Sequence, residues 1–137
     1  MKVIYPVVFS RTNDEKDTYL VEIPDINGFT EGYGLADAIE MARDYIAGHC
    51  YKLSEEELPA ASAIEAIDPA KCEFVDGDNS FVSVIDADLD AYRRKVEKRA
   101  VRRNVSIPAW LDQAAEKEHI NFSRVLQEAL MQKLNQA

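Results

Sequence analysis

The sequence predicts an α+β protein in which a mixed N-terminal domain precedes a small strand–helix–helix domain. Strand and helix periodicities follow one another along residues 1–92 in the order β-β-β-α-β, and one alternating strand with two amphipathic helices follows near the C-terminus. The net charge also changes sign between these parts. Residues 1–92 hold 20 acidic and 6 basic side chains, a net of −14, whereas residues 93–137 hold 5 and 10, a net of +5. We therefore predict two domains, residues 1–92 and residues 93–137.

The first three predicted strands lie close together at the start of the chain. Residues 3–10 are rich in β-branched and aromatic side chains, and residues 18–23 return from them after a polar turn. The turn-forming residues 24–28 contain proline, aspartate, asparagine and glycine. Residues 29–33 are expected to form a short third strand. The first two strands are expected to form a hairpin.

A long amphipathic helix is predicted over residues 35–53. Its buried side is formed by Leu35, Ala38, Ile39, Ala42, Ile46 and Leu53. Residues 54–80 are acidic, contain two prolines, and are expected to be irregular. A fourth strand over residues 81–85 and a connecting helix over residues 88–98 complete the N-terminal domain.

The strand of the C-terminal domain carries side chains suited to reading DNA. Because side chains alternate across a strand, one face presents three polar residues: Arg102, Asn104 and Ser106. Arginine pairs bidentately with guanine, asparagine pairs with adenine, and serine pairs with either base. We therefore predict that these three residues contact base edges.

Two short helices are predicted to follow this strand. Pro108 cannot continue a β-ladder and is tolerated in the first turn of a helix, so a helix is expected over residues 108–118. Asn121 is then the expected N-cap of a second helix. The apolar stripe of that helix is Phe122, Val125, Leu126, Ala129, Leu130 and Leu134.

The C-terminal segment is too small to bury its own apolar side chains. Its strand has no partner within the segment, and chains below about 40 residues rarely hold a core without a disulfide, a metal or oligomerisation. No cysteine lies in residues 93–137. We therefore expect a homodimer in which two copies of the strand pair and four helices close over them.

A basic run leads into the predicted strand. Seven positive side chains, opposed only by Glu97, occur here: Arg93, Arg94, Lys95, Lys98, Arg99, Arg102 and Arg103. Such a run often forms only a solvated helix face. Directly before a DNA-reading strand, it is expected to contact phosphates, chiefly through Arg99 and Arg103. Strand alternation places Arg103 on the face that should point inward. Because it lies near the start of the strand, its side chain is expected to bend away to a phosphate.

Cysteine usage and hydropathy limit the remaining classes. Cys50 and Cys72 show no metal-binding or redox spacing and are expected to be reduced thiols of a cytoplasmic protein. The sequence shows no signal peptide and no apolar run of membrane-spanning length. We expect no metal site, no cofactor and no membrane partner.

The C-terminal segment resembles a ribbon-helix-helix domain of the Arc/MetJ type. This resemblance rests on the alternating strand, the proline that ends it, and the capped second helix. It implies that the two-stranded ribbon enters the major groove of operator DNA. It also implies that the N-terminus of the second helix binds a phosphate through Asn121 and the backbone N–H groups of Phe122 and Ser123.

Several short motifs, in order, resemble the HicB family of antitoxins. They are Tyr5-Pro6, Val21-Glu22-Ile23-Pro24-Asp25, Gly28, Thr30-Glu31-Gly32, Ala36-Asp37-Ala38, Leu58-Pro59-Ala60-Ala61-Ser62 and Asp88-Leu89-Asp90-Ala91-Tyr92. Asn27 replaces a common proline, and Tyr33-Gly34 replaces the usual polar helix cap. The resemblance implies a degenerate ribonuclease-H-like N-terminal domain without catalytic residues.

The same resemblance implies a toxin partner and autoregulation. The partner would be a HicA-type toxin, a small basic ribonuclease, which an acidic domain is suited to bind. The side chains assigned to toxin contact are Glu22, Asp25, Glu31 and Tyr33. The C-terminal domain would repress the operon, alone or together with the toxin.

Two other functions are compatible with the sequence. An active nuclease would need carboxylates that converge on metal ions, and Asp25, Asp86 and Asp88 lie near strand ends. A ribbon-helix-helix repressor could instead sense a metal or a small molecule through its N-terminal domain. Only His49 and Cys50 are adjacent potential ligands for a soft metal, and neighbouring residues on a helix point in different directions.

Overall fold

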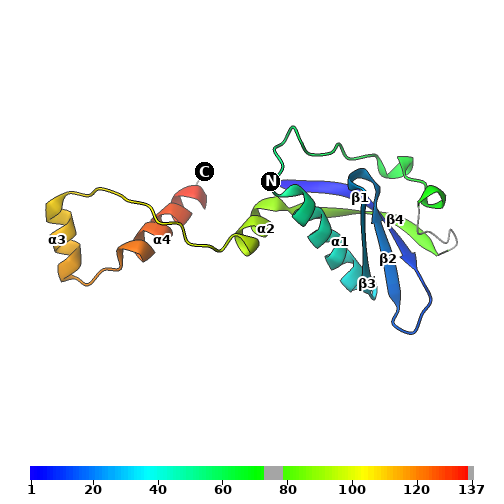
Figure 1. Cartoon of the computed structure of the whole chain (residues 1–137), viewed down its shortest axis with the longest axis horizontal. Helices are drawn as coiled ribbons and strands as arrows, with labels where there is room; N and C mark the ends of the chain where they lie inside the picture. Colours follow the sequence, from blue (N-terminus) through cyan, green and yellow to red (C-terminus); the bar gives the residue numbers. More distant parts are fainter. Residues whose placement is uncertain (73–78, 136–137) are drawn as a thin grey trace. The chain divides into compact units, whose positions relative to one another are not determined.

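Four strands form one antiparallel sheet with the order β3-β2-β1-β4. The computed structural model describes residues 1–72 and 79–135. The strands are β1 (Lys2–Arg11), β2 (Thr18–Ile23), β3 (Gly28–Tyr33) and β4 (Ser80–Asp88). The helices are α1 (Leu35–Cys50), α2 (Leu89–Val96), α3 (Ala109–Lys117) and α4 (Phe122–Asn135), as Figure 1 shows. The predicted α+β class and the β-β-β-α-β order are confirmed.

The hydrophobic core lies between the sheet and α1. Alternate residues of β1 and β2 point to the helix, and α1 buries Ala38, Ala42 and Ile46 against them. Val7 and Ile23 are completely buried at the centre of this layer. The helix ends at Cys50, three residues before the predicted end, and the Leu53 N–H donates to the Cys50 carbonyl in the turn that follows.

Two glycines of β3 let α1 approach the edge of the sheet closely. A Cβ added at Gly32 would lie 2.4 Å from the backbone nitrogen of Ala38, and one added at Gly28 would meet the Tyr45 ring. Gly34 starts α1 at a φ of 87°, where glycine is favoured. The expected polar cap is replaced by Asp37, which accepts a hydrogen bond from the Tyr33 N–H at 2.8 Å.

Helix α2 packs on the C-terminal end of α1. The rings of Tyr51 and Tyr92 lie 5.1 Å apart, and the Arg93 guanidinium donates to the Tyr51 carbonyl. Asp88 caps the start of α2 by accepting from the N–H groups of Asp90 and Ala91. The predicted domain boundary, between residues 92 and 93, therefore falls inside an ordered helix.

The chain divides into an N-terminal unit (Met1–Arg99) and a C-terminal unit (Ala100–Ala137). Residues 93–99, the first part of the basic run, therefore belong to the acidic N-terminal unit and not, as predicted, to the C-terminal one. The N-terminal unit holds 21 acidic and 11 basic side chains, a net of −10, and the C-terminal unit holds 4 and 5, a net of +1. The positive charge is thus concentrated around the junction and not on the two C-terminal helices.

The segment that links α1 to β4 has only two single-turn 3₁₀ helices in its described part, η2 (Ile64–Ala66) and η3 (Pro69–Lys71). Hydrogen bonds tie it to β1 and to the turn between β2 and β3. The Tyr5 hydroxyl donates to the Pro59 carbonyl at 2.7 Å, and the Ser62 N–H and hydroxyl both donate to Asp25. The rest of this predicted irregular stretch, residues 73–78, lies outside the described residues.

The C-terminal unit contains α3 and α4 but lacks the predicted strand. Residues 97–108 form no regular secondary structure. The physical reason is that a strand needs a neighbouring strand for its backbone hydrogen bonds, and a single chain offers none here. The helices agree with prediction: α3 begins directly after Pro108, and Asn121 caps α4 by accepting from the Arg124 N–H at 3.1 Å.

Candidate functional site

The apolar side chains of the C-terminal unit are exposed. In residues 100–135, every Val, Ile, Leu, Met, Phe and Trp is between 40 % and 74 % exposed. A groove of about 570 Å³ separates α4 from the extended segment that precedes α3. It is lined by Arg103, Asn104, Val105, Ile107, Asp112, Phe122, Ser123, Val125, Leu126 and Ala129. An exposed apolar surface of this extent is typical of an interaction site.

The predicted base-reading residues lie on the extended segment beside this groove. Arg102, Asn104 and Ser106 are all exposed, and none has a hydrogen-bond or ion-pair partner among the described residues. Asn104 and Arg103 both line the groove, although strict strand alternation would place them on opposite faces. The single chain therefore leaves these side chains available but does not show the alternation of a ribbon.

The N-terminus of α4 has free backbone donors. Asn121 satisfies the Arg124 N–H, whereas the N–H groups of Phe122 and Ser123 have no partner in the described parts of the chain. Helix N-termini with free N–H groups attract anions. This arrangement is suited to the predicted phosphate contact. Arg99, assigned to another phosphate, is exposed at the end of the N-terminal unit.

The residues predicted to contact a toxin differ in their exposure and in their hydrogen bonding within the chain. Asp25 is occupied, because its two oxygens accept from Ser62 at 2.8 and 2.6 Å. Glu22 is partly buried, and its Oε2 has no hydrogen-bond partner among the described residues. Glu31 and Tyr33 are exposed on the edge strand β3, with Tyr33 57 % exposed. Only Glu31 and Tyr33 are thus openly presented.

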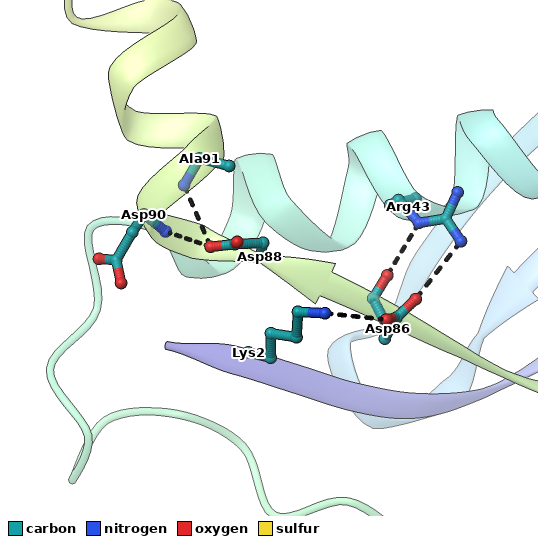
Figure 2. A network of polar contacts seen from close by, with 6 residues as sticks. All are labelled: Lys2, Arg43, Asp86, Asp88, Asp90 and Ala91. Atoms are coloured by element: carbon teal, nitrogen blue, oxygen red, sulfur yellow. Dashed lines mark hydrogen bonds and ion pairs between the residues drawn. The ribbon is translucent and has the colours of Figure 1, made fainter. Parts of the chain in front are cut away.

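The carboxylates considered for nuclease chemistry do not gather in one place. Figure 2 shows Asp86 held by Lys2 and by Arg43, whose Nε also donates to the Asp86 carbonyl at 3.0 Å. Asp88 points instead to the start of α2, where it acts as the helix cap. Within residues 1–72 and 79–135, no three His, Cys, Asp or Glu side chains are placed to hold a metal ion.

Two side chains with structural roles were not predicted from the sequence. Arg43 binds the open edge of β4, and Arg93 binds the C-terminal end of α1. Glu40 and Arg43, three residues apart on α1, also form an ion pair at 2.7 Å. No local pattern identified the distant carbonyls that these two arginines bind.

Both cysteines are held in the thiol form. Burial raises the pKa of Cys50, and burial together with the neighbouring Glu22 and Asp68 carboxylates raises the pKa of Cys72 to about 12. Burial, and then the neighbouring Cys50, likewise raises the pKa of Tyr5 to about 12. A thiolate is the form that attacks electrophiles and binds metals. Cys50 and Cys72, held as thiols, are therefore poorly suited to redox or metal sensing.

Cys72 is accordingly expected to react slowly with iodoacetamide in the native protein at mildly alkaline pH. The raised pKa lowers the thiolate fraction roughly 1,000-fold. A thiolate of higher pKa is also more nucleophilic, which offsets part of this loss in rate, so alkylation is expected to be roughly 30- to 50-fold slower. Mass spectrometry of the native and urea-unfolded chains measures the ratio. Equal rates in both states would contradict the raised pKa.

Comparison with known proteins identifies the family. Residues 5–130 match the family described as the HicB-like antitoxin of bacterial toxin–antitoxin systems. The chain belongs to this family. The match spans most of both units and agrees with the antitoxin resemblance of the sequence motifs. No curated protein matches the chain significantly.

Two solved structures are similar to this HicB-like chain. One is described as a toxin–antitoxin complex from Streptococcus pneumoniae: it is 28 % identical, its TM-score is 0.60, and the alignment covers 97 % of this chain and 99 % of that chain. The other is the antitoxin HicB of Burkholderia pseudomallei: it is 24 % identical, with a TM-score of 0.45 and 98 % of each chain covered. Among the described residues, no helix combines the length and apolar character needed to cross a membrane.

Proposed function

We propose that this HicB-like antitoxin neutralises a HicA-type ribonuclease toxin through its N-terminal unit and represses its own operon through its C-terminal unit. The C-terminal unit would act as a ribbon-helix-helix homodimer, and the N-terminal unit as a degenerate ribonuclease-H-like domain without catalytic activity. The family assignment supports the antitoxin role. The division into two units gives each of these functions a separate part of the chain.

The observation that carries the DNA-binding proposal is the uncovered apolar surface of the C-terminal unit. A second copy would fill the groove beside α4 and supply the missing neighbour for residues 101–107. Pairing of the two strands would then place Arg102, Asn104 and Ser106 on one face, as base reading requires. The free N–H groups of Phe122 and Ser123 would hold a flanking phosphate.

The toxin-binding proposal is supported by charge and exposure. The N-terminal unit carries a net charge of −10, which favours rapid association with a basic protein. Of the residues assigned to toxin contact, Glu31 and Tyr33 are exposed at the β3 edge, and we propose these two as direct contacts. Because Asp25 already fastens the segment at Ser62, we assign it a positioning role and retain Glu22 as a partly buried neighbour.

Replacing Arg102 or Asn104 by alanine is expected to weaken operator binding by roughly 1–3 kcal/mol each, because each removes a base contact. Fluorescence anisotropy with the operator duplex and a scrambled duplex measures the loss of specificity. Gln132→Ala, on α4, is the matched control. Unchanged operator affinity in both variants, with the wild type binding normally, would show that the ribbon assignment is wrong.

The toxin role is tested with residues 1–99 expressed alone. This fragment keeps α2 on α1 and contains the buried core, so it is expected to fold and to inhibit the ribonuclease activity of the cognate toxin. Inhibition by the full chain is measured in parallel. A folded fragment, verified by circular dichroism, that leaves the toxin active while the full chain inhibits it would place toxin binding in the C-terminal unit.

A further inference from the structure

Helix α2 is a basic element fixed to an acidic unit. Asp88 caps its first turn, and the exposed Arg93 lies against the end of α1, where its guanidinium binds the Tyr51 carbonyl and lies 5.8 Å from the centre of the Tyr51 ring. The next cations, Arg94, Lys95 and Lys98, are exposed. None of these three has an ion-pair or hydrogen-bond partner in the described parts of the chain.

The charge of the chain is unevenly distributed around this helix. Residues 93–103 hold seven basic side chains and one acidic side chain, a net of +6, whereas residues 1–92 carry −14. A duplex carries one negative charge per roughly 1.7 Å of its axis. An acidic unit attached next to a DNA-reading segment would be repelled by those phosphates, and the repulsion extends over a Debye length of about 8 Å.

The covalent chain keeps α2 close to the predicted base-reading residues. Only six residues lead from Val96, the end of α2, to Arg102. Fully extended, they span at most about 20 Å, a length along which a duplex carries roughly twelve phosphate charges. A protein that places Arg102 in a groove therefore keeps the end of α2 within about 20 Å of that residue, within reach of the flanking backbone.

We propose that Arg94, Lys95 and Lys98 form a phosphate-binding surface that contacts the DNA backbone beside the base-reading residues. This inference rests on the proposed operator binding and adds a role for the N-terminal unit in it. Phosphate contacts carry no sequence information, so the surface raises the affinity for every duplex. It also offsets the repulsion between the acidic unit and DNA. Arg93 is excluded from it because α1 occupies its guanidinium.

The test replaces all three cations by glutamine in the full chain (Arg94→Gln, Lys95→Gln, Lys98→Gln). The matched control also removes three positive charges from the N-terminal unit, at positions outside α2 and the basic run (Lys16→Gln, Lys52→Gln, Lys71→Gln). Affinities for the operator duplex and for a scrambled duplex of equal length are measured between about 50 and 200 mM salt. Circular dichroism verifies that both variants are folded.

For the α2 variant, the slope of log affinity against log salt is expected to become shallower by about 0.9 for each phosphate that the protein no longer neutralises. Operator and scrambled duplexes should weaken by the same factor, at least about tenfold at the lowest salt. The control should retain the wild-type slope.

Three outcomes would overturn the proposal. If both triple variants show the same decrease in affinity and slope, only the net charge of the unit matters. If the α2 variant keeps the wild-type slope while operator binding persists, this surface does not touch DNA, and the proposed repressor function still stands. If the wild-type chain binds no DNA, the proposed repressor function fails together with this inference.

Discussion

Replacing Leu126 by aspartate is expected to abolish dimer formation and, with it, operator binding. Leu126 lines the groove beside α4 and is 40 % exposed in the single chain. The proposed ribbon-helix-helix dimer would bury this position, and an unpaired carboxylate buried in each copy costs about 3 kcal/mol or more. The dimer dissociation constant should rise at least about 100-fold. Analytical ultracentrifugation across a dilution series measures it.

Met131→Asp is the matched control for this prediction. Met131 is also on α4 and is 61 % exposed, but it does not line the groove. This variant should dimerise and bind operator as the wild type does. If Leu126→Asp remains dimeric at the wild-type concentration, the groove is not the dimer interface. Toxin inhibition by Leu126→Asp should persist, because the N-terminal unit has its own core.

Replacing Gly32 by alanine is expected to be the most destabilising small substitution in the N-terminal unit. The added Cβ would lie 2.4 Å from the Ala38 nitrogen and 2.5 Å from its Cα, so β3 and α1 must move apart. Overpacking against backbone of this kind costs about 3 kcal/mol. For a unit of this size, the Tm should fall by roughly 10–20 °C. Calorimetry or thermal circular dichroism measures the shift.

Gly48→Ala, in α1, provides the contrast. Its new Cβ would lie 3.1 Å from the hydroxyl oxygen of Tyr92, which is the far end of a side chain and can shift. Alanine also favours a helix interior over glycine by up to about 1 kcal/mol. We expect the free energy of unfolding to be unchanged or slightly raised. A destabilisation as large as that of Gly32→Ala would contradict the steric explanation.

The regular elements were largely predictable because their signals are local. The β2 bounds agree with the prediction, and α4 begins directly after its predicted cap, Asn121. Both depend on neighbouring residues: alternation within a strand and a side chain that accepts from a nearby N–H. The end of α1 was predicted three residues too late, because Leu53 continues the apolar spacing of the helix. The helix ends at Cys50, and Leu53 lies in the turn that follows.

The state of individual candidate side chains was not predictable, because it depends on residues far away in the sequence. Asp25 and Glu31 are both acidic residues of the β2–β3 region, yet Asp25 is occupied by Ser62 and Glu31 is exposed. The charge pattern likewise could not distinguish Arg93 from Arg94. Both are exposed, and only the packing of α2 on α1 places the Arg93 guanidinium on the Tyr51 carbonyl and leaves Arg94 without a hydrogen-bond partner among the described residues.

The sequence by itself determined the α+β class, the element order and the contrast between an acidic first part and a basic run, because periodicity, caps and charge are properties of neighbouring residues. The tertiary structure alone decided where the units divide, since α2 is joined to the acidic unit by Tyr92 and Arg93. It also left the predicted DNA-reading strand unformed. A strand is stabilised by hydrogen bonds to a neighbouring strand, and residues 101–107 have no such neighbour among the described residues of this chain.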